Sequence, residues 1–127
     1  MTRVLVVDDE PDILESTEFV LHSYGFDVAT LAQASRIIAT LRKDPPEILM
    51  QDVNMPGLDI DALVRRIRDD PDLQTVHVVL FTASDRAEEI ARRVGADGLI
   101  LKPFDAAHIK EVLEQLLTRP PLAAVKP

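Results

Sequence analysis

The chain has 127 residues, with 14 Lys and Arg against 22 Asp and Glu, and a formal net charge of −8 with His taken as neutral. This length suits one domain with an ordinary hydrophobic core, and the lack of Cys excludes a thiol nucleophile, a thiolate zinc site and a redox pair. The acidic balance argues against direct binding of nucleic acid or an anionic membrane, because both need clustered Lys and Arg.

The first third of the chain predicts a strand, a helix and a second strand. Residues 4–7 are a β-branched apolar run, typical of a strand buried on both faces. Pro11 suits the first turn of a helix, and Gly25 can end it. The apolar stripe of that helix would contain Ile13, Leu14, Phe19, Val20 and Leu21. Residues 27–30 are a short strand.

The middle of the chain repeats this alternation. Residues 34–43 predict a helix, which the prolines after it end. Residues 48–50 form the next buried strand. After a turn, Asp59 is a good cap for a third helix, whose buried side would carry Leu63, Val64 and Ile67.

The last third adds two strand–helix pairs. Residues 76–81 form a fourth strand, followed by a helix over 85–94 that Gly95 ends. Residues 99–101 form a fifth strand, and Asp105 caps the last helix.

Strands that are continuous apolar runs, each followed by a helix, predict a single doubly wound α/β domain. We expect a flavodoxin-like, five-stranded parallel sheet in the order 2-1-3-4-5, with five helices covering both faces. The domain would span residues 1–118, and the Pro- and Ala-rich residues 119–127 would be a tail or the start of a linker. Ligands of such sheets bind beyond the carboxyl ends of the strands, here between the first and third.

The residues at these strand ends predict phosphoryl chemistry. They are Asp8, Asp9, Asp52, Thr82 and Lys102. Three clustered carboxylates repel one another by on the order of 4 kcal/mol per pair at about 4 Å and an effective dielectric constant near 20, so the cluster needs a counterion. Lys102 can supply one positive charge, and the all-oxygen ligand set favours Mg²⁺.

Asp52 stands at the centre of this set, where a carboxylate can attack phosphorus and form an aspartyl phosphate. The metal and Lys102 would neutralise charge on the phosphoryl oxygens, and the Thr82 hydroxyl could donate a hydrogen bond to the product. Ala83 leaves the approach open.

Four runs carry a family resemblance. They are VLVVDDEPD at 4–12, QDVNMPGLD at 51–59, VVLFTA at 78–83 and LILKPF at 99–104. In order and spacing they resemble the response-regulator receiver domain of bacterial two-component signal transduction, over residues 2–118. Each run alone is a weak signal, and their coincidence on a five-fold strand–helix pattern is a strong one.

The resemblance implies that Asp52 accepts a phosphoryl group from the phosphohistidine of a histidine kinase or of a phosphotransfer protein. It implies four Mg²⁺ ligands, which are Asp8, Asp9, Asp52 and the backbone carbonyl of Asn54. Thr82 would move toward the phosphoryl group and Lys102 would pair with it, and the Lys102–Pro103 peptide would be cis. Asn54 and Ser84 resemble the positions that tune phosphoryl lifetime. The helix at 85–94, the fifth strand and the last helix would change their surface for a partner.

Three positions depart from the family pattern. Leu99 stands where many receivers carry Tyr or Phe, a ring that swings inward as the Thr moves, so coupling by that ring is in question. Ile60 replaces the Gly usual after the turn and adds bulk beside the site. Gly98 replaces an acidic residue and the last helix has no Arg, so a receiver-type dimer would lack its ion pairs, and we expect a monomer or weak homodimer.

Other functions stay open at this stage. Asp8 and Asp9 could merely cap the first helix, and Asp52 could be a turn residue. A pseudo-receiver that binds partners without phosphorylation is suggested by Leu99 and Ile60. A Mg²⁺-dependent phosphohydrolase with an aspartyl nucleophile uses the same residue types, but usually has a second Asp two residues after its first-strand nucleophile, where this chain has Glu10.

The remaining features add no catalytic site. His22, His77 and His108 share no ligand spacing and are expected on the surface or partly buried. No window approaches the roughly 20 apolar residues of a membrane span, and we expect no secretory signal from the N-terminal residues. We therefore expect a cytoplasmic protein whose kinase and output partner or domain the sequence does not identify.

Overall fold

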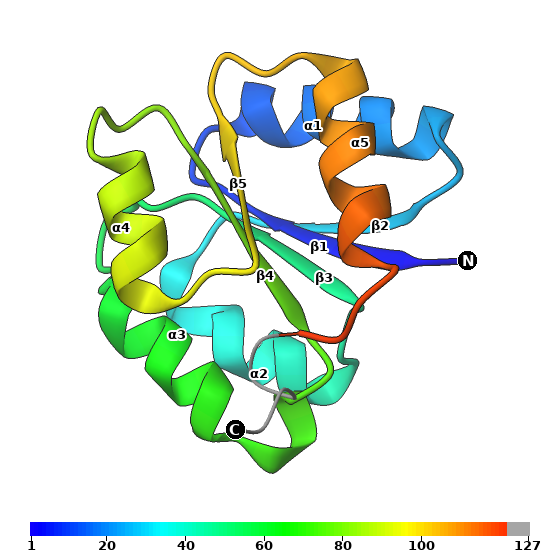
Figure 1. Cartoon of the computed structure of the whole chain (residues 1–127). Helices are drawn as coiled ribbons and strands as arrows, with labels where there is room; N and C mark the ends of the chain where they lie inside the picture. Colours follow the sequence, from blue (N-terminus) through cyan, green and yellow to red (C-terminus); the bar gives the residue numbers. More distant parts are fainter. Residues whose placement is uncertain (122–127) are drawn as a thin grey trace.

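Five strands and five α-helices alternate along the computed structural model, which describes residues 1–121 (Figure 1). The strands are β1 (Arg3–Val7), β2 (Asp27–Leu31), β3 (Ile48–Gln51), β4 (His77–Thr82) and β5 (Gly98–Leu101). The helices are α1 (Pro11–Ser23), α2 (Ile37–Lys43), α3 (Ile60–Asp69), α4 (Ala87–Val94) and α5 (Ala106–Leu116). All strand pairs are parallel, in the order β2-β1-β3-β4-β5, which confirms the predicted fold.

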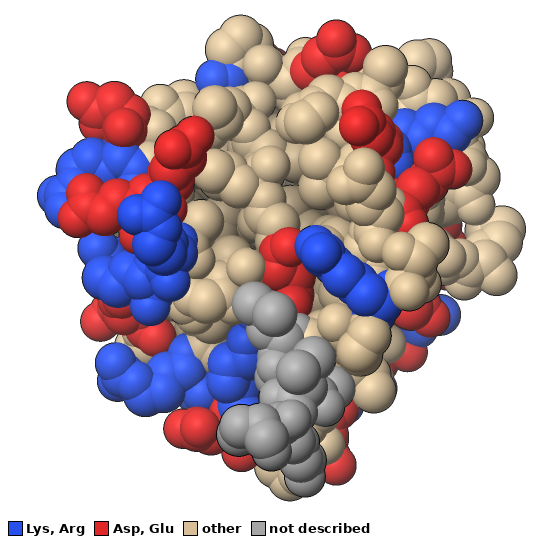
Figure 2. Space-filling model, viewed as in Figure 1, with Lys and Arg blue, Asp and Glu red and all other residues tan. Residues whose placement is uncertain are grey.

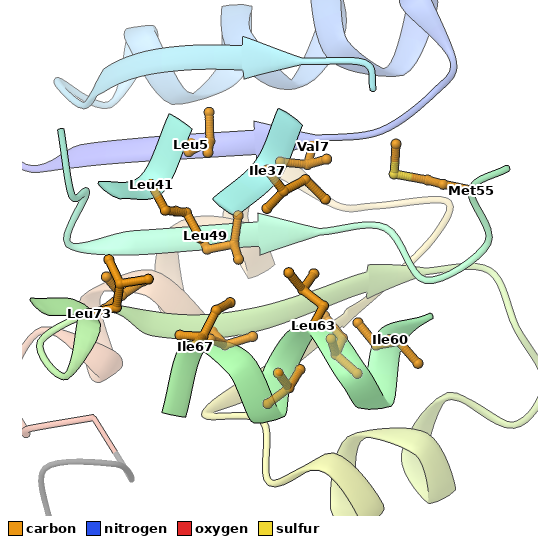
Figure 3. Packing of buried hydrophobic residues seen from close by; sticks show 14 residues of the cluster. Leu5, Val7, Ile37, Leu41, Leu49, Met55, Ile60, Leu63, Ile67 and Leu73 are labelled. Carbon is orange, nitrogen blue, oxygen red and sulfur yellow. The ribbon is translucent and has the colours of Figure 1, made fainter. Parts of the chain in front are cut away.

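The two faces of the sheet pack against different helices, because successive side chains of a strand point to opposite faces. One face places Leu5, Leu49 and Leu80 in a cluster with residues of α2 and α3 (Figure 3). The other places Val6 and Met50 in a second cluster with residues of α1 and α5. The inner strands β1, β3 and β4 are therefore apolar on both faces, which is why they stand out as continuous runs in the sequence.

Helix starts follow local hydrogen bonds more closely than apolar periodicity. The predicted caps are confirmed, because Asp59 accepts a hydrogen bond from Ala62 N at 3.1 Å and Asp105 from Ala107 N at 2.8 Å. The helix predicted from residue 34 begins as a 3₁₀ turn over Ala34–Arg36. The one predicted from residue 85 begins at Ala87, because a turn that starts at Ser84 precedes it.

One predicted core residue of α1 is wrong. Phe19 is 74% exposed, whereas Thr17 and Leu21 are fully buried. Buried positions four residues apart define the inward side of a helix, and Phe19, midway between them in sequence, points the opposite way. Residues 19–21 are all apolar, so the sequence did not indicate which of them faces the sheet.

The end of α4 supports a prediction about stability. Gly95 has φ of 72° and ends the helix in the left-handed conformation. We expect Gly95→Ala to lower the free energy of unfolding by about 1 kcal/mol, because a β-carbon disfavours this backbone. Urea unfolding measures the change. Gly98→Ala is the control, since Gly98 lies in β5 without a positive φ and its added β-carbon would meet no atom closer than 3.4 Å; an equal loss in both variants would contradict the account.

No helix within residues 1–121 is both long enough and apolar enough to cross a membrane. Of the tail predicted at residues 119–127, residues 122–127 lie outside the described part of the chain.

Candidate functional site

The predicted site residues gather beyond the carboxyl ends of β1 and β3, where the strand order reverses. Val7 and Gln51 are paired in register, so Asp8 and Asp52 follow as neighbours. Asp52 N donates to the carbonyl of Val7 at 2.9 Å, and Asp8 N donates to that of Leu31 at 3.1 Å. Both aspartates are thus held by hydrogen bonds that extend the ladders past the strand ends.

Three carboxylates form an acidic cluster at this edge. One oxygen from each of Asp8, Asp9 and Asp52 lies within 4.8 Å of the other two. Asp8 is fully buried and Asp52 is 4% exposed, while Asp9 faces solvent. Glu10 N donates to Asp8 Oδ1 at 2.9 Å, and Asn54 N donates to Asp52 Oδ1 at 3.3 Å. The cluster therefore has two anchored members and one open to solvent.

Lys102 supplies positive charge to the two buried carboxylates. Its Nζ forms an ion pair with Asp8 Oδ2 and lies 3.5 Å from Asp52 Oδ1. Its backbone N–H donates to the carbonyl of Thr82 at 2.9 Å, which ties the residue to the end of β4. Nζ also lies 5.0 Å from the centroid of the Phe81 ring, within range of a cation–π contact. The Lys102–Pro103 peptide that follows is cis.

Burial raises the pKa of the Asp52 carboxyl above its ordinary value. The Lys102 ammonium opposes this shift, the Asp8 carboxylate adds to it, and the Asn54 N–H opposes it again. Two of these carboxylates share one lysine, so negative charge on Asp52 is only partly compensated. A further cation at the cluster would stabilise the ionised form.

The donor set fits a small, hard cation. All three side chains offer oxygen, which is the ligand type that Mg²⁺ prefers. One oxygen of each carboxylate lies within 4.8 Å of the other two, so the three side chains face a common point where such a cation could be held.

The other predicted positions surround this cluster. Thr82 is fully buried at the end of β4, and its Oγ1 accepts a hydrogen bond from Ser84 N at 3.1 Å. Ala83 and Asn54 are exposed, and Ser84 is partly buried. All lie on segments that leave the carboxyl ends of β3 and β4, next to the strand ends that carry Asp52 and Lys102.

Two of the three departures from the family pattern, Ile60 and Leu99, pack in one apolar cluster. Ile60 is buried in the cluster of α2 and α3, so its bulk fills the core beneath the first turn of α3. Leu99 is partly buried and packs against the same cluster. The first turn of α3 thus directs the Ile60 side chain into this cluster, which also contains Val7 and Met55 from the strand end and loop beside the acidic residues.

The histidines lie apart from the acidic cluster. His22 and His108 are exposed, as predicted. His77 is buried instead, because it starts the inner strand β4, and its ring nitrogens lie 3.3 Å from the carbonyl of Glu47 and 2.8 Å from that of Arg119. None of the three belongs to the metal-type cluster found among residues 1–121.

Gln51 is a residue of the site region that sequence reasoning missed. It is fully buried, and its Nε2 donates to the backbone carbonyl of Asp52 at 2.9 Å. The signal was present in the sequence, since an amide ends the otherwise apolar run Ile48–Met50 immediately before Asp52.

The whole domain is similar to proteins of known families. The family model for the response regulator receiver domain matches residues 4–114. The transcriptional regulatory protein CseB of Streptomyces coelicolor is 37% identical over 122 residues, which cover 93% of this chain and 50% of that protein. This chain thus spans about half the length of CseB. The chemotaxis protein CheY-3 of Vibrio cholerae is 32% identical over 120 residues, covering 92% of each.

A solved structure with the same fold bears on the acidic cluster. The response regulator TrrA of Thermotoga maritima superimposes with a TM-score of 0.82 at 26% identity, covering 91% of this chain and 99% of that one. That structure is a complex of TrrA with Mg²⁺ and BeF.

Proposed function

Because the chain belongs to the response regulator receiver domains, we propose that it is a phosphorylation-controlled signalling switch whose phosphoacceptor is Asp52. The observation that carries this proposal is that the buried Asp52 carboxylate lies beside those of Asp8 and Asp9 and 3.5 Å from Lys102 Nζ. In this arrangement Asp52 can attack phosphorus, Lys102 can neutralise negative charge on the phosphoryl oxygens, and the other carboxylates can hold a cation that does the same.

The proposed reaction transfers a phosphoryl group from a phosphohistidine to Asp52. A carboxylate oxygen of Asp52 attacks phosphorus, the P–N bond breaks, and its electron pair leaves with the imidazole, which takes up a proton from solvent. Lys102 moves from pairing with carboxylates to pairing with the new phosphoryl oxygens. The buried Thr82 hydroxyl, which accepts a hydrogen bond from Ser84 N and has its own O–H to donate, donates a hydrogen bond to one of these oxygens.

The proposed cofactor is Mg²⁺. Its ligands would be Asp8, Asp9, Asp52 and the backbone carbonyl of Asn54, and when bound it supplies positive charge for the oxygens of the transferring group. Asn54 and Ser84, two residues after Asp52 and Thr82, border the approach and are proposed to tune the lifetime of the product.

The surface of α4, β5 and α5 is the proposed readout of the switch. Figure 2 shows charged side chains gathered over α4, while the region between α4 and α5 is largely uncharged. A groove there is lined by Leu99, Leu101 and Pro103 together with Glu88, Asp105 and His108, and Leu101 is 49% exposed. Movement of Thr82 would reach this groove through the β4–β5 ladder, which pairs Thr82 with Leu101. A partner responds only as far as its affinity differs between the two states.

The partners follow from this role by chemical class. A histidine kinase or phosphotransfer protein would donate the phosphoryl group, and an output partner or domain would bind the altered surface. We propose no enzyme activity on an external substrate, only catalysis of the domain's own phosphorylation and dephosphorylation. The alternative of a pseudo-receiver, which binds partners without phosphorylation, predicts instead that Asp52 is not labelled even when Mg²⁺ is bound.

Removal of divalent metal tests the proposal. With a small acylphosphate donor and Mg²⁺, we expect the intact mass to rise by one phosphoryl group. With EDTA in place of the metal, labelling should fall by at least about a hundredfold, because the three carboxylates would repel the anionic donor. Restored Mg²⁺ should restore labelling. Equal labelling in EDTA would contradict the proposed role of the cluster.

A further inference from the structure

Gln51 carries a fully buried amide at the end of β3. Its Nε2 donates to the backbone carbonyl of Asp52 at 2.9 Å and contacts Met55 Sδ at 3.5 Å. Its Oε1 is buried and has no hydrogen-bond partner within the described residues. The amide thus directs its donor at the loop that follows β3 and leaves its acceptor unsatisfied.

Packing alone does not account for an amide at this position. Met55 and the neighbouring strand residues Val7, Leu49 and Leu80 belong to one apolar cluster. A buried amide oxygen without a partner costs free energy, whereas Met or Leu would fill similar volume without that cost. The donor contacts of Gln51 are therefore the feature that distinguishes it from an apolar residue here.

Both donor contacts fall on the ends of the segment 52–55. Asp52 N is held by the carbonyl of Val7, and the carbonyl of Met55 accepts from Leu58 N at 3.1 Å. Asn54 lies between these ends and is exposed, and its own N–H makes a contact of 3.3 Å to Asp52 Oδ1. A single nitrogen of Gln51 links the first peptide of this segment to its last side chain, and so limits how far the segment can open.

We propose that Gln51 is a positioning residue that holds segment 52–55 so that the Asp52 carboxylate and the Asn54 carbonyl face one cation. This inference rests on the proposed function, in which those two groups are Mg²⁺ ligands. Gln51 acts through the loop and contacts neither the ion nor the phosphoryl group. Groups behind metal ligands typically change metal affinity by 10- to 100-fold when removed, by altering how the ligands are oriented.

The test compares Mg²⁺ binding by the unphosphorylated parent and Gln51→Met. Methionine keeps the length of the side chain and removes the donor together with the unpartnered Oε1. We expect the Kd for Mg²⁺, measured by titration calorimetry, to rise about tenfold. Without metal, hydrogen exchange of the amides of residues 53–55 should become faster in the variant. Gln51→Leu, which differs in shape, serves as a second variant should methionine not be accommodated.

Gln74→Met is the matched control. Gln74 Nε2 also donates to two backbone carbonyls, those of Arg68 at 2.5 Å and Asp70 at 2.9 Å, but at the opposite end of α3. We expect the Gln74→Met variant to bind Mg²⁺ with the same Kd as the parent. Parent-like binding and exchange in the Gln51 variants would overturn the inference and leave the proposed function intact, as would an equal loss in Gln74→Met. A folded parent that binds no Mg²⁺ would overturn both.

Discussion

Asp52→Asn is expected to abolish phosphorylation by a small acylphosphate donor in the presence of Mg²⁺. The side chain keeps its shape but loses the anionic oxygen that would attack phosphorus. In the intact mass spectrum, the parent should gain one phosphoryl group and the variant none. A circular dichroism spectrum that matches the parent would show that the variant is folded.

The control for this substitution is Asp59→Asn on the same connection between β3 and α3. Asp59 caps α3 through Ala62 N, and Asn caps helices about as well as Asp. We expect this variant to be labelled like the parent. Full labelling of Asp52→Asn would assign the phosphoryl group to another residue and contradict the proposed role of Asp52.

Lys102→Met is expected to lower the free energy of unfolding by about 3 kcal/mol at neutral pH, because it leaves a buried carboxylate without its ion pair. Lys102 is 12% exposed and Asp8 is fully buried, so solvent compensates little for the lost partner. Urea unfolding in EDTA measures the change without a contribution from bound metal. The control is Lys110→Met, since Lys110 is exposed and its ammonium lies 5.1 Å from the Tyr24 ring centroid. The free energy of unfolding of Lys110→Met should fall by less than about 1 kcal/mol.

The loss of unfolding free energy in Lys102→Met should depend on pH, because the substitution changes the environment of the Asp52 carboxyl. Burial raises the pKa of Asp52, and removal of Lys102 takes away the largest opposing influence. A carboxyl with a raised pKa in the folded state binds a proton more readily there than in the unfolded chain, so the free energy of unfolding increases as pH falls through the folded pKa. We expect the deficit of Lys102→Met relative to the parent to shrink between neutral pH and about pH 4. A deficit that grows over this range would contradict the electrostatic origin of the loss.

The fold could be predicted because its signals are local. The inner strands are buried on both faces, so runs such as 4–7 and 48–50 are apolar throughout, and Gly95 and Asp105 mark helix ends by their own backbone preferences. The site could be predicted for a related reason, because parallel strands bring their carboxyl ends to one edge. Asp8 and Asp52 meet there once the strand order is known.

What could not be predicted depends on packing between distant segments. The direction of Phe19 on α1 follows from which side of the helix meets the sheet. The burial of Ile60 depends on how the first turn of α3 packs against the apolar cluster on that face of the sheet. The contacts of Gln51 require the return of the loop to Met55. Neither apolar periodicity nor motif spacing contains that information.

Chemical trapping at position 52 tests the central claim most directly. Borohydride reduces an aspartyl phosphate to homoserine, so the parent, phosphorylated with donor and Mg²⁺ and then reduced, can be digested and sequenced by tandem mass spectrometry. We predict homoserine at position 52 and unmodified aspartate at positions 8, 9 and 59. Homoserine at another of these positions, or unmodified aspartate at all four in a sample that carries the phosphoryl mass, would contradict the account.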